Sequence, residues 1–151
     1  RIAGTFSPTT LNAGGGVIIF DNTATGQNIP SYTYNNLTIL KGGQIGTATG
    51  NLTVNGILNV TSGTFDGDDA SVRVHNIGSI SNSGTVRMDL ASSVNVSLVS
   101  TNTGTVNIGI GTYNNTGNYT NTGGTTTLGT GLLDISGNLS GGTIDFNCFL
   151  R

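Results

Sequence analysis

The chain has 151 residues, a net charge of −2 and five scattered Lys and Arg residues, so it lacks the basic surface that binding to nucleic acid requires. A hydrophobic fraction of 34% with such low charge is not typical of disorder, and no apolar run approaches the roughly 20 residues of a membrane helix, so we expect no membrane insertion. Glu is absent, whereas Gly and Thr abound, which predicts an all-β protein with no helix longer than a turn or two.

The first sixteen residues differ from the rest of the chain. Residues 2–6 form a weak strand pattern, and Pro8 and a triple glycine at 14–16 follow. We interpret residues 1–16 as an entry coil, and residues 17–151 as the repeats of a single domain that spans residues 1–151.

A pattern of four residues with apolar side chains at its second and fourth positions recurs from residue 17 onward. It appears as VIIF at 17–20, NLTI at 36–39, NLTV at 51–54, SVRV at 71–74, TVRM at 85–88, TVNI at 105–108, TTTL at 125–128 and TIDF at 143–146. The first and last tetrads begin seven steps apart, so the mean spacing is 18 residues. The recurrence predicts a parallel β-solenoid, a right-handed β-helix of eight to nine coils with one tetrad in each.

Alternation within the tetrads predicts which side chains face the core. The second and fourth residues, such as Val72 and Val74, are expected to point inward, and only Thr126 places a polar side chain there. Gly-Thr steps at 63–64, 84–85, 104–105 and 142–143 mark a repeated corner. An antiparallel sandwich or barrel also has many short strands, but regular two-residue Asn-Gly or Asp-Gly hairpins are lacking, and this favours the solenoid.

Two stretches carry a family resemblance. TYNNLTI at 33–39 with GNLTVNGILNVTSGTFD at 50–66, and GTVNIGIGTYNNTGNYTNTGG at 104–124, resemble repeats of large secreted adhesin-like β-helix proteins of bacteria, which are often exported by the type IX route. The resemblance implies an extracellular location at the bacterial cell surface and a stalk, adhesive or fibre-forming role. It brings no catalytic residues and no cofactor.

The densest polar cluster surrounds the turn at 66–69. Asp66, Asp68 and Asp69 are the candidates for a calcium site, because hard cations prefer clustered carboxylates. Paired Asp with Arg73 and His75 is also typical of β-helix enzymes that cleave polysaccharides, but those enzymes spread their catalytic groups over several coils. We therefore expect no enzyme activity and a solvated acidic corner, with the single histidine on the outer surface.

Polar residues elsewhere allow several interpretations. Seven Asn-x-Ser/Thr sequons begin at Asn36, Asn51, Asn59, Asn95, Asn114, Asn118 and Asn138. They are either glycan acceptors or, as we prefer, amides that hydrogen-bond between successive coils. Rows of threonine can bind ice or sugars on a flat face, but the first positions of the tetrads vary too much for a regular array. Four tyrosines either stack on surface glycans or pack at corners.

The two ends of a solenoid expose strand edges and core, and this sequence shows no capping helix. The apolar residues expected at the assembly ends are Ile2 and Phe6 at one end and Ile144, Phe146, Phe149 and Leu150 at the other. Cys148 is expected to be a buried hydrophobe or to form an intermolecular bridge. We expect a non-enzymatic structural protein, either a head-to-tail homopolymer subunit of an extracellular filament or a stalk segment; the alternative is a module that binds or cleaves glycans.

Overall fold

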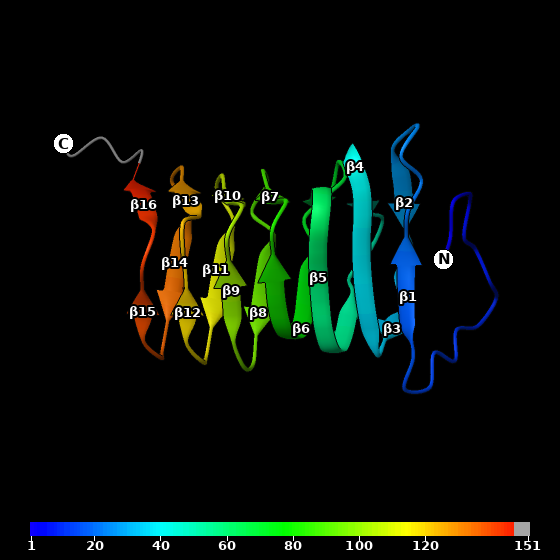
Figure 1. Cartoon of the computed structure of the whole chain (residues 1–151), viewed down its shortest axis with the longest axis horizontal. Helices are drawn as coiled ribbons and strands as arrows, with labels where there is room; N and C mark the ends of the chain where they lie inside the picture. The colour runs from blue at the N-terminus through cyan, green and yellow to red at the C-terminus, as the bar shows by residue number, and fades with distance from the viewer. Residues whose placement is uncertain (147–151) are drawn as a thin grey trace.

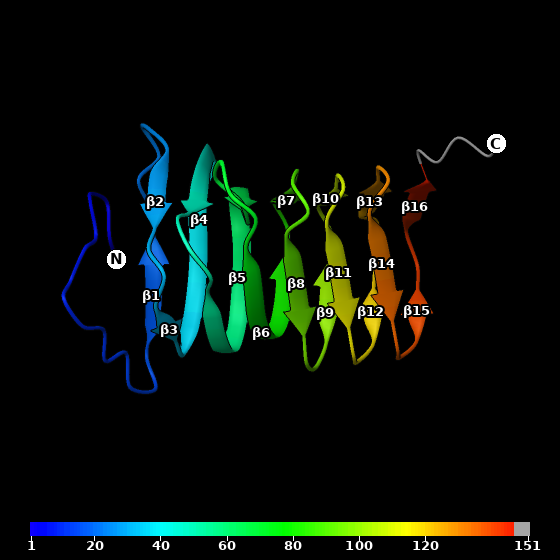
Figure 2. The same ribbon diagram turned by 180° about the vertical axis from the view of Figure 1, so that it is seen from behind.

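The computed structural model describes the backbone of residues 1–146 and the side chains of residues 1–145. This part of the chain contains sixteen strands and no helix, and therefore no helix that is long and apolar enough to cross a membrane. The strands stack along one axis from the N-terminal end to the C-terminal end (Figure 1), and Figure 2 shows the same stack from behind. Every strand pairing is parallel, which confirms the all-β parallel solenoid.

The strands form three faces of a thin prism. Face 1 contains β1 (Val17–Phe20), the first part of β4 (Asn36–Ala48), the middle of β5 (Thr53–Asp66), the end of β6 (Val74–Asn82), β9 (Ser100–Asn102), β12 (Tyr119–Thr120) and β15 (Leu139–Ser140). Face 2 contains β2 (Gln27–Ile29), the ends of β4 and β5, β7 (Thr85–Met88), β10 (Thr105–Ile108), β13 (Thr125–Leu128) and β16 (Thr143–Phe146). Face 3 contains β3 (Thr33–Tyr34), the starts of β5 and β6, β8 (Ser93–Val96), β11 (Thr112–Asn115) and β14 (Leu132–Ile135).

The chain makes about six turns, so the expected eight to nine coils is wrong. Residues that pair on face 2 show the true period, because Thr85, Thr105 and Thr125 are direct neighbours and lie 20 residues apart in sequence. The spacing of 18 residues came from counting tetrads on different faces as successive coils.

The NLTI and NLTV tetrads illustrate the error. Residues 36–39 lie on face 1 and pair with β1, whereas Val54 of the second tetrad lies on face 3 and pairs with Ile77. The tetrad at 71–74 is also misassigned, because Val72 and Val74 are 58% and 42% exposed. By contrast, the four tetrads at 85–88, 105–108, 125–128 and 143–146 stack residue on residue, as expected.

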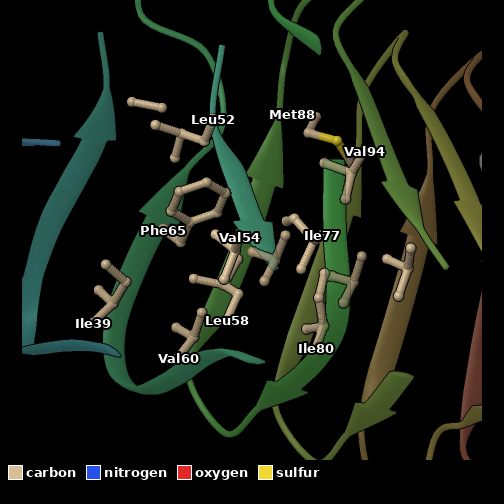
Figure 3. Packing of buried hydrophobic residues seen from close by; sticks show 14 of the residues in the cluster. Ile39, Leu52, Val54, Leu58, Val60, Phe65, Ile77, Ile80, Met88 and Val94 are labelled. Atoms are coloured by element: carbon tan, nitrogen blue, oxygen red, sulfur yellow. The ribbon is translucent and has the colours of Figure 1, made fainter. Parts of the chain in front are cut away.

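The core is a column of side chains enclosed by the three faces. In Figure 3 the side chains of Val54, Leu58, Phe65 and Ile77 point toward one another from strands on different faces. These residues are at most 2% exposed, so every second position along each strand supplies the interior. Burial of this apolar surface is the main source of stability for the turns that contain it.

The interior of the C-terminal half is more polar. Asn82, Asn102 and Asn121 are buried at the corner between faces 1 and 2, where each Nδ2 donates to the next Oδ1 at 2.7 Å. Thr126, the residue that breaks the apolar pattern, is also buried and shares a 2.7 Å hydrogen bond with the hydroxyl of Tyr119. These buried polar groups are paired, as the low dielectric of an interior requires.

Residues 1–16 pack over the first turn. Ile2 forms a bridge with Phe20, and the ring of Phe6 lies edge-on to Phe20 and Tyr32, with centroids 5.7 and 6.1 Å away. Ile2 and Phe6 are only partly exposed, so this end of the prism differs from the bare strand edge that the sequence suggested.

Candidate functional site

The acidic corner does not gather its carboxylates around one point. Asp66 is buried and its Oδ2 lies 2.5 Å from Nη2 of Arg87 on the next turn. Asp68 is buried too, and its Oδ2 accepts the backbone N–H of Leu90 at 3.0 Å. Asp69 instead pairs with Arg73 through contacts of 2.8 and 2.9 Å. Each carboxylate has its own protein partner, and residues 1–146 contain no group of three or more ligating side chains that would hold a metal ion.

The Asp66 carboxyl is the most perturbed of these groups. Burial raises its pKa, and the hydrogen bond and charge of Arg87 oppose that rise. Since Arg87 spans from one turn to the next, the pair holds successive rungs of face 2 together. This geometry is that of a structural ion pair rather than of two carboxylates placed on either side of a glycosidic bond.

His75 faces the core, so its expected place on the outer surface is wrong. Val74 is the outward residue at this point of β6, and the alternation therefore turns His75 inward, where it is fully buried. Its Nδ1 accepts the Leu52 N–H at 3.1 Å, so the proton lies on Nε2, which donates to the Gly67 carbonyl at 2.5 Å. Burial lowers the pKa of the imidazole, and the side chain acts as a neutral bridge between turns.

Face 2 carries a regular row of threonines on its outer side. Thr64, Thr85, Thr105, Thr125 and Thr143 are register partners on consecutive turns. The Gly-Thr steps in the sequence indicated this row. The row is not visible when tetrads that lie on different faces are compared as if they lay on successive turns. The neighbouring outer row is mixed: it contains Asp66, Arg87, Asn107, Thr127 and Asp145. A face with only one uniform row is a poor match for a lattice-binding surface.

Face 3 carries asparagines beside a shallow groove. Nδ2 of Asn95 donates to Oδ1 of Asn76 at 3.1 Å, and Nδ2 of Asn114 donates to Oδ1 of Asn95 at 2.8 Å. The groove has a volume of about 340 Å³ and runs over four turns. Its lining consists of uncharged residues, which include Ser97 and Thr116 as well as the asparagines. Such a lining is suited to neutral, hydroxyl-rich ligands.

Most of the sequons have the structural role that we preferred. Asn95 and Asn114 belong to the face 3 row, and the side-chain oxygens of Asn36, Asn51 and Asn118 accept backbone N–H groups of Ile57, Val74 and Asn138 on the next turn.

The tyrosines mostly lie inside the prism. Tyr34, Tyr113 and Tyr119 are fully buried, and the rings of the last two pack edge-on at 5.7 Å. Stacking of these three rings on a surface glycan is therefore wrong, because their faces are not accessible. The sequence could not distinguish this arrangement, since tyrosine suits both a corner and a core.

The last described turn is the least covered part of the core. On one side β14, β15 and β16 pair with β11, β12 and β13, and no described strand pairs with their other side. Leu133, Ile135 and Ile144 continue the inner rows but are only partly buried, whereas Tyr113 and Val106 one or two turns earlier are at most 1% exposed. Of the expected assembly residues, Ile144 lies here and Phe146 ends β16, while Phe149 and Leu150, like Cys148, lie outside the described residues.

No protein-family model, curated protein or solved structure matches the chain.

Proposed function

We propose that the chain is a non-enzymatic structural module of a rod at the bacterial cell surface, either a subunit of an extracellular filament or a segment of an adhesin stalk. The observation that carries the proposal is the C-terminal turn, where three parallel strands present an unpaired edge among the described residues beside partly buried Leu133, Ile135 and Ile144. Such an edge binds a further parallel rung through backbone hydrogen bonds and apolar contact.

The next rung has two possible sources. In a stalk, the chain itself continues to wind in the same way. In a filament, a second copy adds head to tail, which is a heterologous contact that does not close. The filament also requires the incoming copy to contact residues 1–16, because Phe6 and Ile2 cover its first turn.

A non-enzymatic role is supported by the use of the acidic corner. Asp66 and Asp68 are buried and bonded within the rod, and His75 is enclosed in the core with both ring nitrogens engaged. All three side chains are at most 5% exposed. The extracellular location is part of the proposal and is supported by the resemblance of the repeats to secreted adhesins.

Binding of a glycan along face 3 is the second candidate, because the groove beside Asn76, Asn95 and Asn114 presents neutral amides and hydroxyls in a row. This use is compatible with a structural rod, and it requires no catalytic group. Glycan-array binding that is lost on Asn95→Leu substitution would support it.

Electron microscopy and light scattering over a range of concentrations test the filament. We expect rods that lengthen with concentration, and Ile135→Lys should stop growth because it places a charge on the inner row of the open edge. Leu132→Lys is the matched control, since Leu132 lies on the outer side of the same strand and is 55% exposed. Monodisperse particles at all concentrations would overturn the filament. The stalk is then tested by a tandem fusion of two copies, which should form one continuous rod with slowed amide exchange in β14–β16 of the first copy.

A further inference from the structure

The first two turns contain a buried lysine. Lys41 is the only lysine of the chain, it lies at the corner between faces 1 and 2, and it has no solvent-exposed surface. Its Nζ donates a 3.1 Å hydrogen bond to Oε1 of Gln27. A buried ammonium is normally paired with a carboxylate. In the described structure the hydrogen-bond partner is instead a carboxamide, a group that can acylate an amine.

The carboxamide of Gln27 is held in one orientation. Gln27 is 7% exposed, and its Nε2 donates to the carbonyl oxygens of Ile2 at 2.9 Å and Gly4 at 2.5 Å. These two acceptors fix which atom is the nitrogen and direct the carbonyl group toward Lys41. The bond from Nζ to Oε1 also polarises that carbonyl. The carbonyl oxygens of Ile2 and Gly4 therefore contact Nε2, the nitrogen that would leave as ammonia if the carboxamide acylated an amine.

Among the described residues, Asp21 forms an ion pair with Arg1 and none with Lys41. Its negative charge acts on the Lys41 ammonium, and its Oδ2 lies 3.4 Å from Nη1 of Arg1. Its Oδ1 is buried and has no hydrogen-bond partner among the described residues. Burial lowers the pKa of Lys41, although the charge of Asp21 opposes the shift. A desolvated lysine is more often the neutral amine and is therefore more nucleophilic.

We propose that Lys41 and Gln27 form an intramolecular isopeptide bond in the folded chain. The neutral Nζ attacks Cδ, which lies one C=O bond, about 1.2 Å, from the oxygen it already contacts. The attack requires the carboxamide to turn within its contacts to Ile2 and Gly4, so that Cδ rather than Oε1 faces Nζ. A proton moves from Nζ to Nε2, the Cδ–Nε2 bond breaks, and ammonia leaves. One amide is exchanged for another, so no oxidant or cofactor is needed.

The bond joins the first turn to the second. Gln27 lies on β2 and Lys41 on β4, strands that pair on face 2, so the product is a covalent link between neighbouring rungs. Such a link prevents the first turn from peeling away. The inference is independent of the proposed function, because it depends only on these two side chains.

Mass spectrometry of the full chain tests the proposal. The purified protein, incubated at pH about 9 to favour the neutral amine, should lose about 17 Da, the mass of ammonia. After denaturation, trypsin should no longer cut at residue 41, so peptides 2–41 and 42–73 should be replaced by a single peptide 2–73. Fragment ions should place the link between Gln27 and Lys41.

Two variants separate the proposal from its alternatives. Lys41→Arg keeps a cation but cannot form the bond, and Gln27→Met removes the acyl group, so neither variant should lose ammonia by this route. Succinimide formation at Asn55-Gly56 causes the same mass loss, but it would persist in Lys41→Arg and leave cleavage at residue 41 intact in the wild type. An unchanged mass, or full cleavage after Lys41 in the wild type, would overturn the proposal even if a variant fails to fold.

Discussion

The buried asparagine row offers the sharpest test of what holds the turns together. Oδ1 of Asn102 accepts from Asn82 at 2.7 Å and from the Gly104 N–H at 3.2 Å, while its Nδ2 donates to Asn121 at 2.7 Å and to the Thr125 carbonyl at 3.2 Å. Replacing Asn102 with Ala deletes all four bonds. The Gly104 N–H and the Asn121 Oδ1 are then left without these partners inside the rod.

The expected loss of stability follows from those two groups. A buried polar group without a partner costs about 1–3 kcal/mol, so the two groups together should lower the free energy of unfolding of Asn102→Ala by roughly 2–6 kcal/mol. Asn102→Asp is nearly isosteric but replaces a donor with an acceptor, so it should cost at least as much at neutral pH and recover partly on acidification. Asn107→Ala, on the outer side of β10, is the control and should stay within about 0.5 kcal/mol.

Equilibrium unfolding in urea provides the measurement, through the shift in midpoint at constant slope. Equal midpoints for Asn102→Ala and Asn107→Ala would refute the reasoning, because the amide row would then contribute no more than a surface side chain. A changed slope would mean instead that the turns no longer unfold together.

Three further predictions use the same unfolding assay. The pKa of His75 is lowered from 6.5 in the folded chain, so the unfolded imidazole takes up a proton first when the pH falls. The free energy of unfolding should therefore be at its full value above about pH 6.5 and should decrease on acidification. His75→Gln should remove that pH dependence, and a wild type with no pH dependence between about pH 6.5 and 5 would contradict the assignment. Arg87→Met leaves its buried carboxylate partner uncompensated and should cost roughly 1–3 kcal/mol, whereas Arg73→Met breaks a more exposed pair and should cost under about 1 kcal/mol; equal losses would contradict a structural role for the buried pair. Gly63→Ala should cost about 1–3 kcal/mol, because φ is +74° and a Cβ would meet a backbone oxygen at 2.5 Å, while Gly15→Ala meets nothing within 4 Å and should be neutral.

The repeat pattern predicted the fold but not the number of turns. All three faces use the same alternating tetrad, so similarity between two faces of one turn cannot be distinguished in sequence from similarity between two turns. The tetrads at 36–39 and 51–54 match closely and yet lie on different faces. The Gly-Thr steps at 63–64, 84–85 and 104–105 were the better guide, because their threonines are register partners on consecutive turns of face 2.

The candidate site was only partly predictable for the same reason. The sequence brought Asp66, Asp68 and His75 together, since they are close along the chain. It could not show that Asp66 pairs with Arg87 on the next turn, or that alternation places His75 inside. Both facts depend on the register between turns and on where β6 begins.

By itself, the sequence predicted that the chain winds into stacked parallel strands, because one alternating pattern recurs between glycine corners without the regular two-residue hairpins of an antiparallel sheet. The tertiary structure alone decided how many turns there are, which polar side chains enter the core, and that Lys41 meets Gln27. Those outcomes depend on which residues become neighbours across turns about 20 residues apart, and spacing along the chain does not record that register.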